Sequence, residues 1–95
     1  MQQMSHTNDK ILGHLAISPK DRRSVTALDL AIAARVRHAR VASGLSQEEL
    51  GHAIGVSWQQ IYKYEVGTNR VAASRLYLIS IHTKRPIGFF FEKAE

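Results

Sequence analysis

The sequence predicts an all-α fold, in which an N-terminal extension precedes a compact domain of five short helices. Three observations support this prediction. From about residue 28 onward, apolar residues recur at intervals of three and four, which is the spacing of amphipathic helices. Serine or threonine followed three positions later by an acid or amide marks helix starts, and glycine marks helix ends. With 95 residues and 44% hydrophobic content, the chain is large enough for one modest core.

We expect residues 1–25 to be a flexible N-terminal extension and residues 26–95 to be the folded domain. Polar residues dominate the first ten positions, and residues 18–23 form a charged, turn-prone stretch. A mobile arm is the simpler interpretation of this segment. The alternative is a basic arm that contacts phosphates through Lys20, Arg22 and Arg23.

The first predicted helix runs from about Leu28 to Ser43. Thr26 and Asp29 approximate a capping box at its start, where the Asp29 carboxylate also suits the positive end of the helix dipole. Gly44 supplies the left-handed residue that ends the helix. The residues expected on its buried face are Leu28, Ile32, Val36 and Ala39.

A second helix, a glycine turn and a third helix follow in the middle of the chain. Ser46 opens the second helix, with Glu49 as its capping partner. Ser57 opens the third helix, with Gln60 in the reciprocal position. Gly55 ends the second helix, because glycine adopts the backbone angles of a tight turn without strain. Two such helices crossing steeply leave the polar side of the second one facing outward.

Gly51 lies where these two helices are expected to cross. A side chain larger than alanine at this position would push the helices apart. Gly67 closes the third helix. The inner face of the second helix is expected to consist of Leu50, Ala53 and Ile54. The apolar positions expected to pack between the two helices are Leu50, Ile54, Val56, Ile61 and Tyr64.

A fourth helix is expected from about Ala73 to Thr83, with Leu76 and Ile79 facing inward. Pro86 then interrupts the chain, and a short fifth helix is expected around residues 88–92. Three consecutive aromatic residues in this last helix suit the core and a dimer contact better than a ligand site. They are Phe89, Phe90 and Phe91.

Composition argues against several classes of protein. The chain has no cysteine, which excludes disulfides and cysteine-based zinc sites. No apolar run approaches the roughly 20 residues of a membrane span, and the N-terminus lacks the order of a signal peptide, so we expect a cytoplasmic protein. The five histidines lack metal-ligand spacing, and no HExxH, P-loop or nucleophile-elbow motif is present. We therefore expect no enzymatic activity, no metal and no cofactor.

The net charge of +5 is concentrated in the middle of the chain. Eight basic and three acidic residues lie between Arg35 and Arg85, so this segment carries the whole excess. A basic segment around a helix pair suits a polyanionic partner. Charge alone is equally consistent with a basic surface that has no partner.

A set of short motifs spans the predicted helices: Arg35-Val36-Arg37-x-x-Arg40, Gly44-Leu45-Ser46-Gln47-x-x-Leu50, Gly55-Val56-Ser57, Ile61-x-x-Tyr64-Glu65-x-Gly67 and Pro86-Ile87-x-Phe89-Phe90. With these motifs, about two thirds of the chain resembles the Cro/repressor-like family, also called Xre-like. The resemblance implies a compact five-helix repressor-like helix-turn-helix domain. It also implies a transcriptional regulator, usually a homodimeric repressor, that binds double-stranded DNA at a pseudo-palindromic operator.

By position, the resemblance implies that three residues of the third helix read base edges, namely Trp58, Gln59 and Lys63. Glutamine can pair bidentately with adenine and lysine can donate to guanine, each with about 1–3 kcal/mol of discrimination. Trp58 departs from the family, in which a polar residue is commoner at this position. Packing on the DNA backbone, packing on a thymine methyl group and a protein interface are its open alternatives.

The resemblance also implies contacts with the DNA backbone. The second helix begins near Gln47, and its N-terminal amides can bind a phosphate, although an exposed polar helix start is the simpler alternative. The loop after the third helix resembles the second phosphate clamp of the family. Two further residues beside the base-reading positions could reach phosphates or thymine methyl groups. The expected backbone contacts are Gln47, Ser57, Tyr62, Thr68, Asn69 and Arg70.

Arg40 and Glu65 occupy positions that form a structural ion pair in the family, and a phosphate contact by Arg40 is the alternative. The end of the fourth helix departs from the family. His82 and Thr83 replace aliphatic residues there, and Lys84 replaces the usual glycine. Either this helix ends early, or its polar groups are satisfied at a dimer contact.

Two other functions stay open at the level of sequence. One is a protein-interaction module, such as the antitoxin of a toxin–antitoxin pair, in which the N-terminal arm or the Phe-rich end holds a protein partner. The other is a structural protein that coats DNA without sequence preference. In that protein, Trp58 and Gln59 would read no bases.

Overall fold

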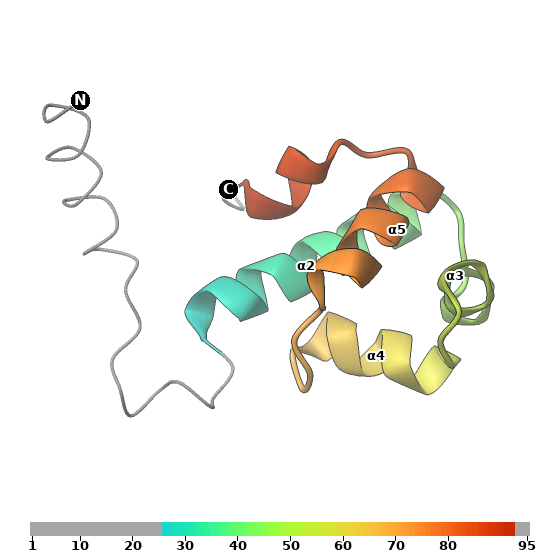
Figure 1. Ribbon diagram of the computed structural model, residues 1–95, viewed down its shortest axis with the longest axis horizontal. Helices are drawn as coiled ribbons and strands as arrows, with labels where there is room; N and C mark the ends of the chain where they lie inside the picture. The colour runs from blue at the N-terminus through green and yellow to red at the C-terminus, as the bar shows by residue number, and fades with distance from the viewer. Residues whose placement is uncertain (1–25, 93–95) are drawn as a thin grey trace, which may run out of the picture.

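The computed structural model describes residues 26–92, which form four α-helices and one 3-10 helix (Figure 1). The expected flexible extension, residues 1–25, lies outside the described residues. The prediction of an all-α fold is confirmed over the part that the structure describes, where no strand occurs. The elements in chain order are α2 (Ala27–Ala42), α3 (Gln47–Ile54), α4 (Trp58–Val66), α5 (Ala73–Thr83) and η2 (Ile87–Phe91).

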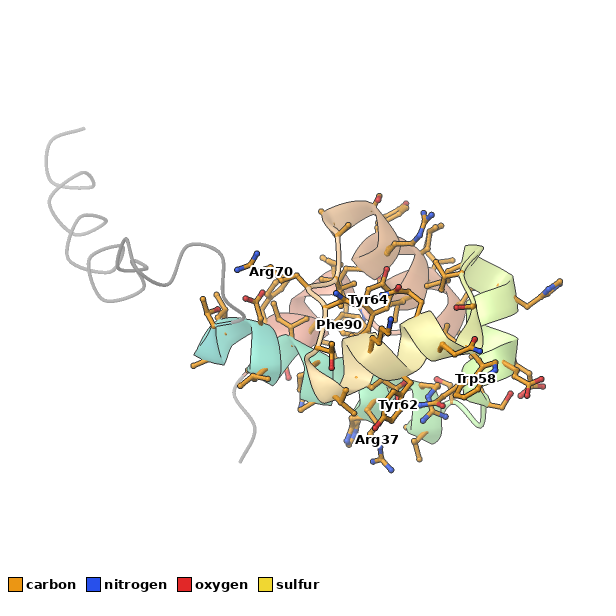
Figure 2. All side chains as sticks on the ribbon, turned by 90° about the horizontal axis from the view of Figure 1, so that it is seen from below. Arg37, Trp58, Tyr62, Tyr64, Arg70 and Phe90 are labelled. Atoms are coloured by element: carbon orange, nitrogen blue, oxygen red, sulfur yellow. The ribbon has the colours of Figure 1, made fainter. Side chains whose placement is uncertain are left out.

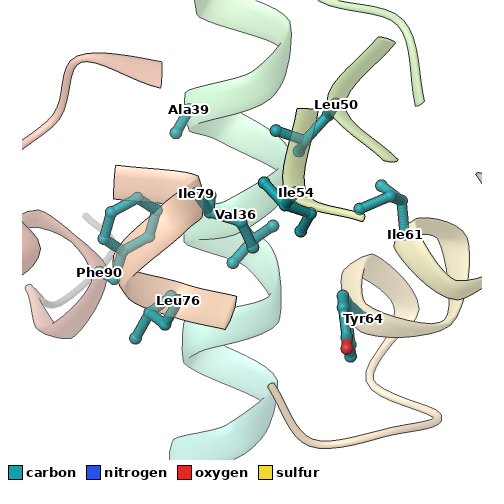
Figure 3. Close-up of a cluster of buried hydrophobic side chains, with 9 residues drawn as sticks. All are labelled: Val36, Ala39, Leu50, Ile54, Ile61, Tyr64, Leu76, Ile79 and Phe90. Atoms are coloured by element: carbon teal, nitrogen blue, oxygen red, sulfur yellow. The ribbon is translucent and has the colours of Figure 1, made fainter. Parts of the chain in front are cut away.

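The helices are arranged so that α4 forms one edge of the molecule. In Figure 1, α2 runs across the back, α5 crosses in front of it, and α4 lies along the bottom with α3 at its right-hand end. Every element contributes to a single core between them, drawn in Figure 3. The buried cluster consists of Val36, Ala39, Leu50, Ile54, Ile61, Tyr64, Leu76, Ile79 and Phe90.

Two residues expected in the core are exposed instead. Leu28 is 50% exposed, because the first turn of α2 extends beyond α4 and α5 in Figure 1. The buried face of α2 therefore begins one turn later, at Ala33. Ala53 is also exposed, because α3 turns Leu50, Gly51 and Ile54 toward its neighbours instead.

Helix α4 begins with a simpler cap than predicted. The Ser57 hydroxyl accepts a hydrogen bond from the backbone N–H of Gln60 at 3.2 Å. The sequence predicted that the side chain of Gln60 would bond back to the cap, and this prediction was wrong. The Gln60 side chain instead donates to the Asn69 side chain at 3.4 Å, because the loop after α4 lies within its reach. The two other predicted capping boxes are confirmed, those of Thr26 with Asp29 and of Ser46 with Glu49.

The segment expected as a fifth α-helix is a 3-10 helix, η2. It has only five residues, and short helical pieces commonly take this tighter form, here with the Phe89 N–H donating to the Pro86 carbonyl at 2.9 Å. The side chain of Arg35 in α2 contacts η2 and holds it in place. The Arg35 Nε donates to the Phe89 carbonyl at 3.0 Å, and the guanidinium lies 3.7 Å from the centre of the Phe89 ring.

The end of α5 rules out an early helix end, and it satisfies the Thr83 hydroxyl within the protein. The helix runs through Thr83, which is buried, and the Thr83 hydroxyl donates to the Ile79 carbonyl at 2.7 Å. Thr83 therefore needs no partner protein to satisfy its hydroxyl. Lys84 ends the helix with φ at 58°, the left-handed conformation that glycine usually supplies, at a cost of about 1 kcal/mol.

Gly51 allows α3 to approach the turn before α4 more closely than the sequence suggested. A β-carbon at this position would lie 2.6 Å from the backbone carbonyl oxygen of Val56. Even alanine does not fit there without movement of the backbone, so the expectation that only larger side chains would clash was wrong.

We expect Gly51→Ala to lower the free energy of unfolding by about 1–3 kcal/mol, because overpacking at a fixed backbone contact outweighs the gain in helix propensity. Urea unfolding followed by circular dichroism measures this change. The matched control is Gly88→Ala, where an added β-carbon meets no atom within 4 Å. An equal loss in both variants would show that the α3 contact is not the cause.

Candidate nucleic-acid interface

Helix α4 has one buried side and one exposed side. Ile61, Tyr64 and Glu65 face the core, whereas the residues between them face solvent. Figure 2 views this edge of the molecule from below. The predicted base-reading residues all lie on the exposed side: Trp58, Gln59 and Lys63.

The start of α3 lies beside the start of α4. Trp58 and the residues Ser46, Gln47 and Glu48 line an open pocket of about 330 Å³. The side-chain amide of Gln47 donates to Glu65 Oε1 at 3.1 Å, which ties the first turn of α3 to α4. The structure thus brings the predicted phosphate contact at Gln47 next to the predicted base-reading residue at Trp58.

Arg40 and Glu65 form an ion pair between α2 and α4. Arg40 Nε donates to Glu65 Oε2 at 2.5 Å and Nη2 donates to Oε1 at 3.0 Å, while Nη1 donates to the Leu45 carbonyl at 2.8 Å. The side chains are only 12% and 1% exposed. All three guanidinium nitrogens are therefore engaged within the protein, which favours the structural role of Arg40 over a phosphate contact.

The loop after α4 places the second group of predicted backbone contacts at the other end of this helix. In Figure 2, Arg70 and Trp58 lie at opposite ends of α4. Arg70 Nε donates to Asp29 Oδ2 at 3.3 Å, so the loop is joined to the start of α2. Thr68 and Asn69 are exposed beside it. Tyr62 lies between the two ends, exposed on the flank of α4.

Asp29 has a lowered pKa, chiefly because its carboxylate accepts a hydrogen bond from the Thr26 backbone N–H. Burial is the second-largest effect and raises the pKa, while the Thr26 hydroxyl and Arg70 lower it by smaller amounts. A carboxyl whose pKa is lower in the folded state stabilises that state above its unfolded pKa, near 3.8, and loses this contribution as the pH falls.

We therefore expect Asp29→Asn to lower the free energy of unfolding by about 1 kcal/mol at pH 7 and to have little effect near pH 3. Urea unfolding at both pH values tests this prediction. If the free energy of unfolding falls by the same amount in the wild type and in Asp29→Asn between pH 7 and pH 3, the role of the Asp29 carboxylate is contradicted.

Two exposed residues in this region were missed by the sequence reasoning. Arg37 projects from α2 on the same side as Tyr62 in Figure 2, and within residues 26–92 it has no ion pair. Nothing in the sequence indicates which face of α2 lies beside α4. Val66 is exposed at the end of α4, and its spacing of four residues from Tyr62 is the signal that could have identified it.

Other kinds of site have less support. Among residues 26–92, no three histidine, aspartate or glutamate side chains are grouped so that they could hold a metal ion. No helix in the described part of the chain has the length and apolar character needed to cross a membrane.

Known proteins resemble this chain in sequence and in structure. The Helix-turn-helix family model matches residues 36–90. An HTH-type transcriptional regulator of Sinorhizobium medicae is 45% identical over 75 residues, which cover 79% of this chain and 54% of that protein. A transcriptional regulator in the ATPase CF(0) region of Rhodospirillum rubrum is 48% identical over 75 residues, 79% of this chain and 69% of that protein. The chain thus spans about half the length of the first of these relatives.

A solved structure has the same fold. The restriction-modification controller protein C.AhdI from Aeromonas hydrophila superposes with a TM-score of 0.65 at 24% sequence identity, over 70% of this chain and 100% of that one. The fold, the matched family model and the relatives agree with the motifs that the sequence carries. The chain belongs to the Cro/repressor-like, or Xre-like, helix-turn-helix family.

Proposed function

We propose that this protein is a cytoplasmic, sequence-specific DNA-binding transcriptional regulator, a homodimeric repressor that reads the major groove with α4. The observation that carries the proposal is the exposed side of α4, on which Gln59 and Lys63 stand one turn apart with no part in the core. Gln59 is suited to adenine and Lys63 to guanine. Membership of a family of regulators supports the same function.

The dimensions of α4 suit the groove. An α-helix with its side chains is about 10–12 Å across, which fits a major groove about 12 Å wide, so that α4 can lie along the groove. The start of α3 near Gln47 and the loop with Arg70 stand at its two ends, where phosphates flank the groove. The first-turn amides of α3 and the Ser57 side chain would contact one strand, and the residues Thr68, Asn69 and Arg70 would contact the other.

A homodimer would present two copies of α4 to one face of the DNA. Large apolar side chains on α5 and η2 are exposed and could form the surface for such an association. With two-fold symmetry, the operator would be a pseudo-palindrome with half-sites about 34 Å apart. The exposed side chains are Tyr77, Ile81, Ile87 and Phe91.

Selection of binding sites from random double-stranded DNA tests this function. We expect enrichment of an inverted repeat whose half-sites are separated by about ten base pairs. The control is the variant Gln59→Ala/Lys63→Ala, which should not enrich the same sequence. Binding without enrichment of any sequence would contradict specific recognition, and enrichment of single half-sites would contradict the homodimer.

A further inference from the structure

The exposed side of α4 carries a stripe of large apolar side chains beside its polar residues. Trp58, Tyr62 and Val66 are spaced four residues apart and are 46%, 51% and 47% exposed. This spacing keeps successive side chains on neighbouring parts of one helix surface. The stripe runs the whole length of α4, next to the polar pair formed by Gln59 and Lys63.

The core does not explain this stripe. The buried side of α4 is formed by Ile61, Tyr64 and Glu65, and the stripe residues are about half exposed in the presence of every other described element. In Figure 2, Trp58 and Tyr62 project from the outer flank of α4, clear of the buried Tyr64 and Phe90. The stripe is therefore an unpartnered apolar surface within residues 26–92.

Its location on the proposed reading helix indicates what it contacts. Protein–DNA interfaces are generally polar and positively charged, so apolar side chains on a reading helix need an apolar target. The thymine C5-methyl group is the apolar feature that base edges present in the major groove. Large apolar side chains are suited to contact it.

The polar pair and the apolar stripe can read the same base pairs. An A·T pair presents adenine N6 and N7 on one side of the major groove and the thymine methyl group on the other. Gln59 is suited to the adenine edge, while a neighbouring stripe residue would cover the methyl group. From Trp58 to Val66 the helix rises about 12 Å, which corresponds to roughly three or four base pairs.

We propose that Trp58, Tyr62 and Val66 read thymine methyl groups, so that each half-site contains a thymine-rich run of about three or four base pairs. The proposal rests on the proposed function and specifies its target. It makes Val66 a specificity-determining residue. It assigns Trp58 and Tyr62 to base methyl groups rather than to phosphates.

Replacement of thymine by deoxyuridine tests the proposal, since it removes the methyl group and leaves the base-pairing edge unchanged. The probe is the DNA selected by the full-length protein, with each half-site thymine replaced in turn. We expect the affinity to fall about fourfold for each methyl group that the stripe contacts. Replacement of thymines outside the half-sites should leave the affinity unchanged.

The variants Trp58→Ala, Tyr62→Ala and Val66→Ala assign the contacts. Each variant should bind the thymine probe more weakly and should become insensitive to deoxyuridine at the position that its side chain covers. Leu28→Ala is the matched control, because it removes a similarly exposed apolar side chain from the first turn of α2. It should keep the wild-type response to every probe. Circular dichroism confirms that all variants are folded.

The outcomes separate this proposal from the function on which it rests. If a site is enriched but deoxyuridine has no effect, or the same effect in the wild type and all variants, methyl readout is wrong and the proposed function stands. The stripe would then be a surface for a protein partner. If no sequence is enriched, both proposals fail.

Discussion

Arg40→Ala is expected to lower the free energy of unfolding by about 3–5 kcal/mol. The substitution removes three hydrogen bonds at once, two to the Glu65 carboxylate and one to the Leu45 carbonyl. The Glu65 side chain is only 1% exposed, so water cannot replace the lost partner. Gln47 would be left as the one recorded donor to a buried carboxylate, and one neutral amide does not balance that charge.

Urea unfolding followed by circular dichroism measures this loss. Arg40→Met combined with Glu65→Met is the matched control, because removal of both residues leaves no unpaired buried charge and should cost less than Arg40→Ala alone. A single variant within about 1 kcal/mol of the wild type would contradict a structural role for the pair. Such a result would return Arg40 to the alternative of a phosphate contact.

The second large effect concerns DNA. We expect Gln59→Ala/Lys63→Ala to weaken binding to the selected site by about 2–6 kcal/mol, because each side chain contributes about 1–3 kcal/mol of discrimination. Binding to random DNA should weaken much less, since Lys63 adds only one positive charge to the non-specific attraction. Titrations of both DNAs at one fixed salt concentration measure the two losses.

Arg70→Ala provides the comparison for this prediction. This variant should lose a similar binding free energy on the selected site and on random DNA. The magnitude of the slope of log affinity against log salt concentration should decrease by about one unit. Equal losses on both DNAs for Gln59→Ala/Lys63→Ala would contradict base reading. An unchanged slope for Arg70→Ala would remove Arg70 from the backbone contacts.

Features that depend on local chemistry were predictable from the sequence. The capping boxes at Thr26 and Ser46 were predicted correctly, because a hydroxyl and the carboxyl three residues later need only each other and the first helical turn. Gly44 and Gly55 were identified as left-handed residues for the same reason, and their φ angles are 75° and 79°. The resemblance to the family placed Trp58, Gln59 and Lys63 on the exposed side of α4, and all three side chains are exposed there.

Features that depend on a neighbouring element were predicted less well. Leu28 fits the helical period but is half exposed, because α4 and α5 do not extend as far as the first turn of α2 in Figure 1. The Gln60 side chain turns to Asn69, which belongs to a loop that the cap pattern does not include. Gly51 cannot be replaced even by alanine without movement of the backbone, because an added β-carbon would meet a backbone carbonyl in the following turn.

The sequence by itself determined the helix boundaries, the crossing of α3 and α4, and the family, since these depend on residues close together in the chain. Only the tertiary structure decided that Gln47 joins Arg40 on one carboxylate, and that Arg70 is held by Asp29. It also decided that Trp58, Tyr62 and Val66 form an apolar stripe with no cover among residues 26–92. Periodicity indicates that a helix has two sides, but burial depends on what the rest of the chain packs against each one.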